Sequence, residues 1–137
     1  MSESSRQPWL RAVVILGLWY AFVGIVFAWP ASHAKAWRLA AWGVSAVAYA
    51  AHICYERFRF RNSPRLAALH VALAAALGAF GLAVGANIHS LSVGTSHEHR
   101  RLLLLALGLW PILTALPAFL VALVAGWALA LAGPRAK

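Results

Sequence analysis

Acidic residues are scarce in this sequence, and none lies well inside an apolar segment. Asp and Glu together number 3 in a chain of 137 residues. Proton-coupled transporters commonly depend on a carboxylate placed deep in the membrane. The sequence therefore lacks the central group that an antiporter of that type would need.

Cysteine and the common catalytic motifs are also missing or nearly so. Cys54 is the only cysteine, which excludes an internal disulfide and C-x-x-C redox chemistry. The chain contains neither H-E-x-x-H nor G-x-S-x-G, the motifs that would suggest a membrane hydrolase. These absences favour a protein that is not an enzyme.

Apolar residues are what the sequence has in abundance. The chain is 63% hydrophobic and 11% charged, with a mean hydropathy of +0.75, whereas a soluble domain is about 45–50% apolar and about 25% charged. Apolar segments near or above ~17 residues can cross a hydrocarbon core, where the backbone must be helical. We therefore expect an all-α integral membrane protein, one domain over 1–137, with helices at about 12–29, 37–56, 64–88 and 96–132. These would form an up-down-up-down bundle, with the long fourth helix kinked at Pro111 and Pro117.

The positive charge is distributed as a membrane protein requires. The net charge is +9, but the basic residues fall at segment ends and in loops, which argues against a nucleic-acid partner. Eight lie on the side of the termini and the second loop, and four on the other side. The eight are Arg6, Arg11, Arg57, Arg59, Arg61, Arg65, Arg135 and Lys137; the four are Lys35, Arg38, Arg100 and Arg101. The positive-inside rule then predicts a plasma membrane protein (bacterial inner membrane) with both termini cytoplasmic.

Small residues mark the faces expected to pack. Gly81 and Gly85 form a G-x-x-x-G step on the third helix, and Gly78 lies on the same side, as does His70. A stripe on the second helix is also small and polar. It consists of Ala41, Ser45, Ala48, His52 and Glu56. We expect these two faces to press together.

His52 and His70 are the side chains most in need of an explanation. In an antiparallel hairpin they would lie at similar depth, near the cytoplasmic ends of the second and third helices. Two such imidazoles could be the axial ligands of a b-type haem. Structural hydrogen bonding is the other interpretation, because Glu56 lies one turn after His52, and a proton-relay or substrate role is a third.

Two further clusters lie at the membrane surfaces. His97 and His99, with His89 nearby, could bind Zn²⁺ or Cu²⁺. The rings of an H-x-H pair in a helical turn point about 200° apart, however, which works against joint chelation. The second cluster alternates basic and aromatic residues and predicts an interface with anionic lipid or an acidic partner. It consists of Arg57, Phe58, Arg59, Phe60 and Arg61.

Taken together, these features predict a small non-catalytic membrane protein, an accessory or assembly subunit of a larger membrane complex, respiratory complexes included. The expected partners are the lipid bilayer and other membrane subunits or further copies of the chain. One alternative is an electron-transfer protein with haem b held by His52 and His70. The other is a small-solute transporter or channel that acts as a homo-oligomer.

Overall fold

Four helices account for almost the whole of the described chain. The structure is a computed structural model that describes residues 8–28, 35–94 and 96–132. Its helices run, in chain order, α1 (Pro8–Ala28), α2 (Lys35–Phe58), α3 (Pro64–Val93) and α4 (His97–Ala132). The all-helical prediction is confirmed. Three of the helices, α1, α3 and α4, are long and apolar enough to cross a membrane. The number of spans and the orientation stay predictions. The two chain ends, whose side of the membrane the charge count predicts, lie outside the described residues.

Local signals explain where α3 begins and ends. Ser63 has an extended backbone and its side chain accepts a hydrogen bond from the Leu66 amide at 3.4 Å, so it caps α3 directly before Pro64. At the other end Gly94 adopts φ 68°, the left-handed conformation that glycine tolerates best. The helix thus continues five residues beyond the predicted end at residue 88. The added residues mix polar and apolar side chains, and a boundary drawn where the continuous apolar run stops misses them.

The third helix is the centre of the bundle. Of the most apolar stretch of α3, 50% is buried inside the protein, against 22% for α1 and 11% for α4. Both neighbours pack on α3, whereas α2 touches the other helices sparingly. The outer surface of α4 is instead suited to lipid, which solvates apolar side chains as well as a protein interior does.

The glycine face of α3 packs against α1. A Cβ atom on Gly78 would lie 2.6 Å from the Cβ of Tyr20, and one on Gly81 would lie 2.8 Å from the Cβ of Ala21. Gly85 approaches Ile25 on the same helix. The two backbones can therefore come this close only because α3 has glycine at these positions.

Leucines of α3 fill the matching positions on α1. Leu77 lies against Gly17 and Leu82 against Gly24, so each helix offers glycine where the other is bulky. The expectation that the glycine face of α3 presses against the second helix is wrong. Helical periodicity identifies the glycine face of α3 correctly. It cannot identify the helix that packs on this face, because α3 has three neighbours and residue spacing within one helix does not distinguish among them.

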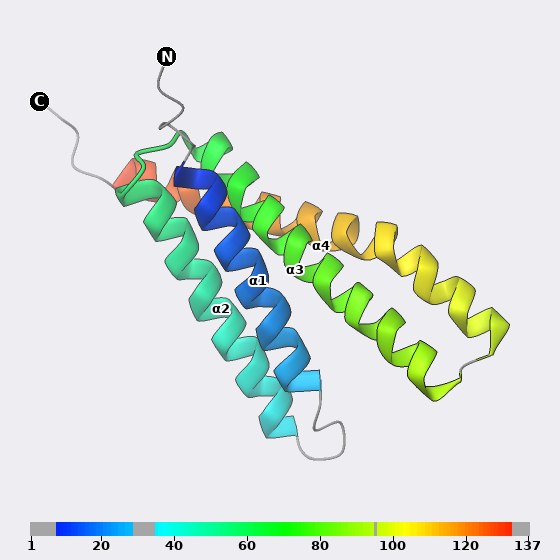
Figure 1. Cartoon of the computed structure of the whole chain (residues 1–137). Coiled ribbons are helices and arrows are strands. Elements are labelled where there is room, and N and C mark those ends of the chain that lie inside the picture. Colours follow the sequence, from blue (N-terminus) through cyan, green and yellow to red (C-terminus); the bar gives the residue numbers. More distant parts are fainter. Residues whose placement is uncertain (1–7, 29–34, 95, 133–137) are drawn as a thin grey trace, which may run out of the picture.

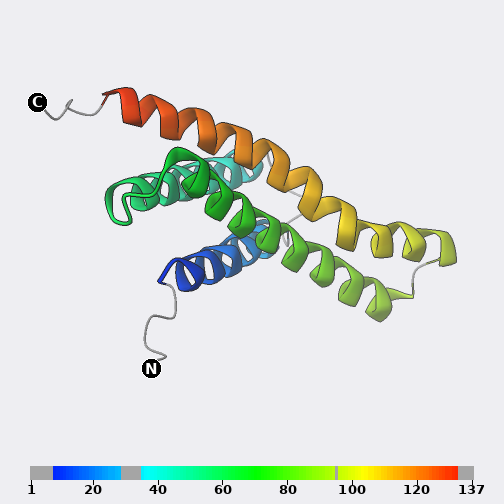
Figure 2. The ribbon, with the colours of Figure 1, turned by 90° about the horizontal axis from the view of Figure 1, so that it is seen from above.

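Asn87 links α3 to α4 near their connecting turn. Its side-chain amide donates to the Ala83 carbonyl and to the Leu103 carbonyl, at 2.8 Å each. Pro111 and Pro117 both lie inside α4, which continues through them as one helix. In Figures 1 and 2, α4 changes direction along its length. Each proline removes one backbone donor from the helix, which favours such a bend.

The two hairpins, α1–α2 and α3–α4, diverge from a common end (Figures 1 and 2). We call the common end, where Pro8, Phe58, Pro64 and Ala132 lie, the Glu56 end; the opposite end, at the α3–α4 turn, is the open end. The apolar core lies in the half of the bundle near the Glu56 end. Its buried members are Ile53, Ala68, Val71 and Ala122.

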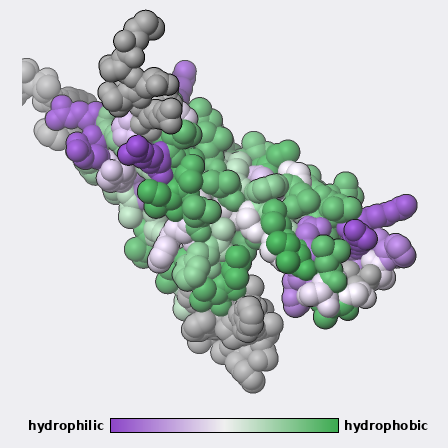
Figure 3. All heavy atoms as spheres, in the orientation of Figure 1, coloured by the Kyte–Doolittle hydropathy of each residue, from purple (hydrophilic) through white to green (hydrophobic). Residues whose placement is uncertain are grey.

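The surface is apolar between two polar regions. In Figure 3 the hydrophilic side chains gather at the Glu56 end and at the α3–α4 turn, and the visible surface between them is mostly hydrophobic. Large side chains exposed on α4 include Leu105 and Leu131, which are 67% and 78% accessible. Such a surface fits a lipid environment and would aggregate in water.

Candidate functional site

A buried carboxylate lies at the centre of the Glu56 end. Glu56, in the last turn of α2, has 0% of its surface accessible. One carboxylate oxygen, Oε2, accepts a hydrogen bond from the side-chain amide of Asn62 at 2.7 Å, and lies 3.1 Å from Nδ1 of His70. A carboxylate without water needs such partners, because burying an uncompensated charge is very unfavourable. Three successive elements, α2, the α2–α3 turn and α3, supply the members of this group.

His52 approaches the other oxygen of the same carboxylate. It lies one turn before Glu56 on α2, and its Nε2 is 3.9 Å from Oε1. That separation is too long for a hydrogen bond. Both ring nitrogens of His52 and Oε1 of Glu56 are buried without a hydrogen-bond partner. His52 therefore lies close to the Glu56 carboxylate without forming a hydrogen bond to it.

Trp9 covers His70 from α1. The two rings are stacked, with centroids 4.6 Å apart and planes 2° from parallel. Stacking on indole is favourable for an imidazole, and more so when the imidazole is protonated. The site thus draws on three helices, with α1 providing the aromatic cover, α2 the carboxylate and α3 the hydrogen-bonded histidine.

The chemistry available to this cluster is proton binding and ion pairing. With His70 protonated, the His70–Glu56 contact is a buried ion pair with a charge-assisted hydrogen bond. His52 and His70 also line separate surface hollows, one between α1 and α2 and the other beside Trp9 and Phe60. Both ring nitrogens of His52 are nevertheless buried, and Glu56 is fully enclosed.

The structure brings His52 and His70 together, as the sequence predicts, but around Glu56. Axial ligation of one haem requires both imidazoles to face a shared iron, with the porphyrin between them. Here each imidazole is directed toward a different oxygen of one carboxylate, and Trp9 is stacked on one of the rings. This arrangement does not fit a haem held between the two.

The other predicted site residues lie apart from this cluster. His97 and His99 are exposed in the first turn of α4, and His89 is exposed near the end of α3. Over the described ranges 8–28, 35–94 and 96–132, no group of three or more His, Cys, Asp or Glu side chains is arranged to hold a metal ion. The predicted metal cluster is therefore not assembled in this conformation.

The basic and aromatic segment that follows Glu56 forms the surface of the Glu56 end. Phe58 is 70% accessible, and Arg59 and Arg61 are exposed. Phe60 turns inward instead, edge-on to Tyr55 at 5.2 Å between ring centroids. The segment thus exposes Arg59, Arg61 and the Phe58 ring, while the Phe60 ring contacts Tyr55, and the lipid or partner interface stays a prediction.

Three members of the cluster were missed or undervalued by the sequence reasoning. Glu56 was recognised only as a neighbour of His52, because it lies at the end of its apolar segment. One feature of the sequence could have pointed to it: Glu56 is a single acidic residue beside a segment that carries four arginines and no other acidic residue. Asn62 and Trp9 carried no signal, since a turn amide and an interfacial tryptophan are common in membrane proteins.

Comparison with known proteins gives no relative: no family model, no curated protein and no solved structure matches this chain.

Proposed function

We propose that this chain is a small non-catalytic subunit of a larger membrane complex, and that it contacts a helix of another protein through the exposed side of α2. The observation that carries the proposal is the uneven burial of α2. Only His52, Ile53 and Glu56, in its last two turns, are buried among the described side chains of this helix. Every described side chain from Leu39 to Ala51 is exposed or partly buried.

The composition of α2 supports contact with protein over contact with lipid. It is the least apolar of the four helices and is not among the three that are apolar enough to span a membrane. Its uncovered surface also includes small residues such as Gly43 and Ala50, and nothing lies within 4 Å of a Cβ placed on Gly43. Small residues allow another helix to approach closely in lipid.

The buried cluster supports the same role by fixing α2 in position. Contacts between Glu56, His70 and Asn62 hold the end of the helix, and the Tyr49 hydroxyl donates a hydrogen bond to the Ala118 carbonyl of α4. A helix that is anchored at a few points keeps a defined orientation while its outer face stays uncovered. That is the form a docking helix needs, because less ordering entropy is lost on binding.

Site-specific photo-crosslinking in native membranes tests this proposal. Val47 on α2 and Leu105 on α4 are matched positions, 70% and 67% accessible. A photoreactive residue at Val47 should give one discrete crosslinked product containing a second membrane protein. The same residue at Leu105 should give crosslinks to lipid alone.

Two outcomes would overturn the accessory role. Identical lipid crosslinks at both positions would mean that α2 faces the bilayer. A product of twice the chain's 14.7 kDa, containing this chain only, would mean that α2 mediates self-association.

A haem-binding electron-transfer role is less well supported, because Glu56 lies against both candidate axial ligands. Absorption spectra of the purified protein, oxidised and reduced, test it directly. A Soret band lost in His70→Ala and kept in His99→Ala would revive the haem hypothesis. Transport by a homo-oligomer has no comparable contact in its favour, since the hollow between the two hairpins is lined mainly by apolar side chains.

A further inference from the structure

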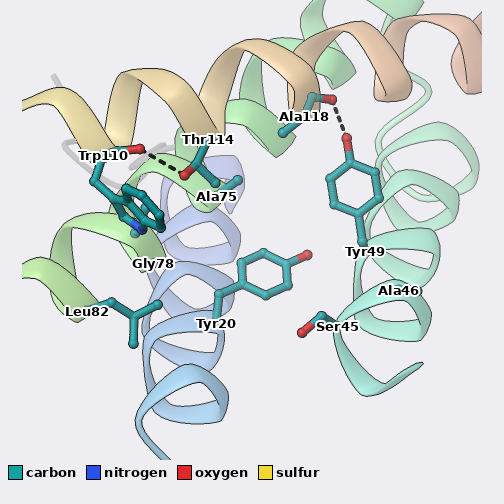
Figure 4. A pocket seen from close by; sticks show the side chains of 11 residues that line it. Tyr20, Ser45, Ala46, Tyr49, Ala75, Gly78, Leu82, Trp110, Thr114 and Ala118 are labelled. Atoms are coloured by element: carbon teal, nitrogen blue, oxygen red, sulfur yellow. Dashed lines mark hydrogen bonds between the residues drawn. The ribbon is translucent and has the colours of Figure 1, made fainter. Parts of the chain in front are cut away.

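A pocket of about 380 Å³ lies between the two hairpins, where α1, α2, α3 and α4 all contribute to its walls. Most of the lining is apolar, including Ala46, Ala75, Gly78 and Leu82 (Figure 4). Among the described residues, no charged side chain lines it. Its size falls in the range of about 300–1,000 Å³ typical of small-molecule sites.

The hydroxyl of Tyr20 is the unexplained feature of this pocket. Figure 4 shows the Tyr20 ring reaching from α1 into the space between the helices, with the Ser45 hydroxyl directed into the same space from α2. The Tyr20 oxygen is buried and has no hydrogen-bond partner. A buried hydroxyl left without a partner is destabilising, so its presence needs an explanation.

The hydroxyl of the other tyrosine in the pocket, Tyr49, does have a hydrogen-bond partner within the protein. Its hydroxyl donates to the Ala118 carbonyl, and Thr114 likewise donates to the Trp110 carbonyl, at 2.8 Å in the second case. Both donors are thus satisfied within the protein. Tyr20 lines the same pocket with a donor of the same kind, and no described residue accepts its hydrogen bond.

The depth of Tyr20 limits what can accept its hydrogen bond. Tyr20 comes twelve residues after Pro8, or about 18 Å along the helix axis, which is near the middle of a hydrocarbon core of about 30 Å. Phospholipid ester groups lie in the interfacial layer, and their acyl chains have no acceptor at this depth.

We propose that this pocket binds an uncharged lipophilic quinone or ketone whose carbonyl oxygen accepts a hydrogen bond from Tyr20. A carbonyl oxygen has two lone pairs and no proton, so the Tyr20 and Ser45 hydroxyls can both donate to it. The aromatic side chains of Tyr20, Tyr49 and Trp110 line the pocket and suit a planar conjugated ring. The apolar walls take the rest of the molecule. This inference stands independently of the accessory role.

The test uses 2-decyl-1,4-benzoquinone, labelled with ¹³C in its carbonyl carbons, and the full chain in lipid nanodiscs. Binding is measured by calorimetry, and the carbonyl stretching band of the bound probe by infrared difference spectroscopy. We expect saturable binding and a carbonyl band at lower frequency than in lipid alone. Tyr20→Phe should weaken binding about two- to tenfold and move the band back toward its lipid frequency.

Three controls make the result specific. Tyr55→Phe removes the hydroxyl of a half-exposed tyrosine outside the pocket and should change neither measurement. Ala46→Trp places an indole in the pocket from α2 and should abolish binding. Decylbenzene, which lacks the carbonyl, should bind more weakly than the quinone.

Several results would overturn the proposal. They are equal affinities of the wild type and Tyr20→Phe, an unshifted carbonyl band in the bound state, and equal binding of decylbenzene and the quinone. The last result would reduce the pocket to a cleft for lipid chains. Absence of saturable quinone binding to the folded wild type would also overturn the proposal.

Discussion

At the Glu56 end all four helices meet, whereas toward the open end the α1–α2 and α3–α4 hairpins separate (Figure 1). The meeting point combines an apolar core with the contacts of Glu56, His70 and Asn62. In the separated part, α3 and α4 are joined by Asn87, but described polar contacts between the two hairpins are confined to the Glu56 end and to Tyr49.

The difference reflects how helices associate in lipid. Lipid chains are as apolar as leucine, so the hydrophobic effect does not draw two membrane helices together. Close backbone contact and polar bonds must do this instead. Glycines provide the contact between α1 and α3, and the buried carboxylate provides the bond that holds α2. The Gly78–Tyr20 contact and the Tyr49–Ala118 hydrogen bond both border the pocket, which lies where the two hairpins part.

Removal of the carboxylate should disrupt the Glu56 end most. Glu56→Ala leaves the buried His70 and the partly buried Asn62 without their acceptor, and we expect a loss of about 3–5 kcal/mol in the free energy of unfolding. Reversible unfolding of the protein in mixed micelles, titrated with SDS, measures this. Glu56→Gln keeps an acceptor for Asn62 and should lose less.

Glu98→Ala is the matched control for this prediction, because Glu98 is an exposed glutamate in the first turn of α4. It should change the unfolding free energy by less than about 0.5 kcal/mol. Equal effects of Glu56→Ala and Glu98→Ala would show that the buried cluster does not hold α2.

The α1–α3 contact should be the next most sensitive. A methyl group on Gly78 would meet the Cβ of Tyr20 at 2.6 Å and the Gly17 carbonyl oxygen at 3.3 Å, so Gly78→Ala should destabilise by about 1–3 kcal/mol. Gly108→Ala in α4 meets nothing within 4 Å and should be neutral or stabilising. The same SDS titration compares the two. A stabilising Gly78→Ala would contradict the packing described above.

The smallest effect belongs to the single hydrogen bond between α2 and α4. Tyr49→Phe removes the donor to the Ala118 carbonyl while keeping the ring, and should cost about 0.5–1.5 kcal/mol. It should also raise the rate of amide hydrogen exchange in α2 before Tyr49 more than in its last two turns. If amide exchange were uniform along α2 in the wild type and in Tyr49→Phe, the helix would not have an anchored end and a less stable remainder.

Particular residues show why part of this structure was predictable. The start of α3 could be predicted because Ser63 followed by Pro64 is a local capping signal. The all-helical fold could be predicted because it follows from long apolar runs in the sequence. The glycine face of α3 follows from helical periodicity alone. Its partner does not, because α1 and α2 both offer small residues. The burial of Glu56 could not be predicted either, because it depends on His70 of α3 and Asn62 of the α2–α3 turn, which only the folded chain places beside it.

The sequence by itself determined that the chain is helical and apolar, where α3 begins, and that Gly78, Gly81 and Gly85 share one face with His70. These properties depend on local propensity, on capping and on a period of 3.6 residues. Only the tertiary structure decided that this face meets α1, that Glu56 lies between two histidines, and that the hairpins diverge. In lipid the choice of partner helix rests on a few close contacts and buried polar bonds, and these form between residues far apart in the chain.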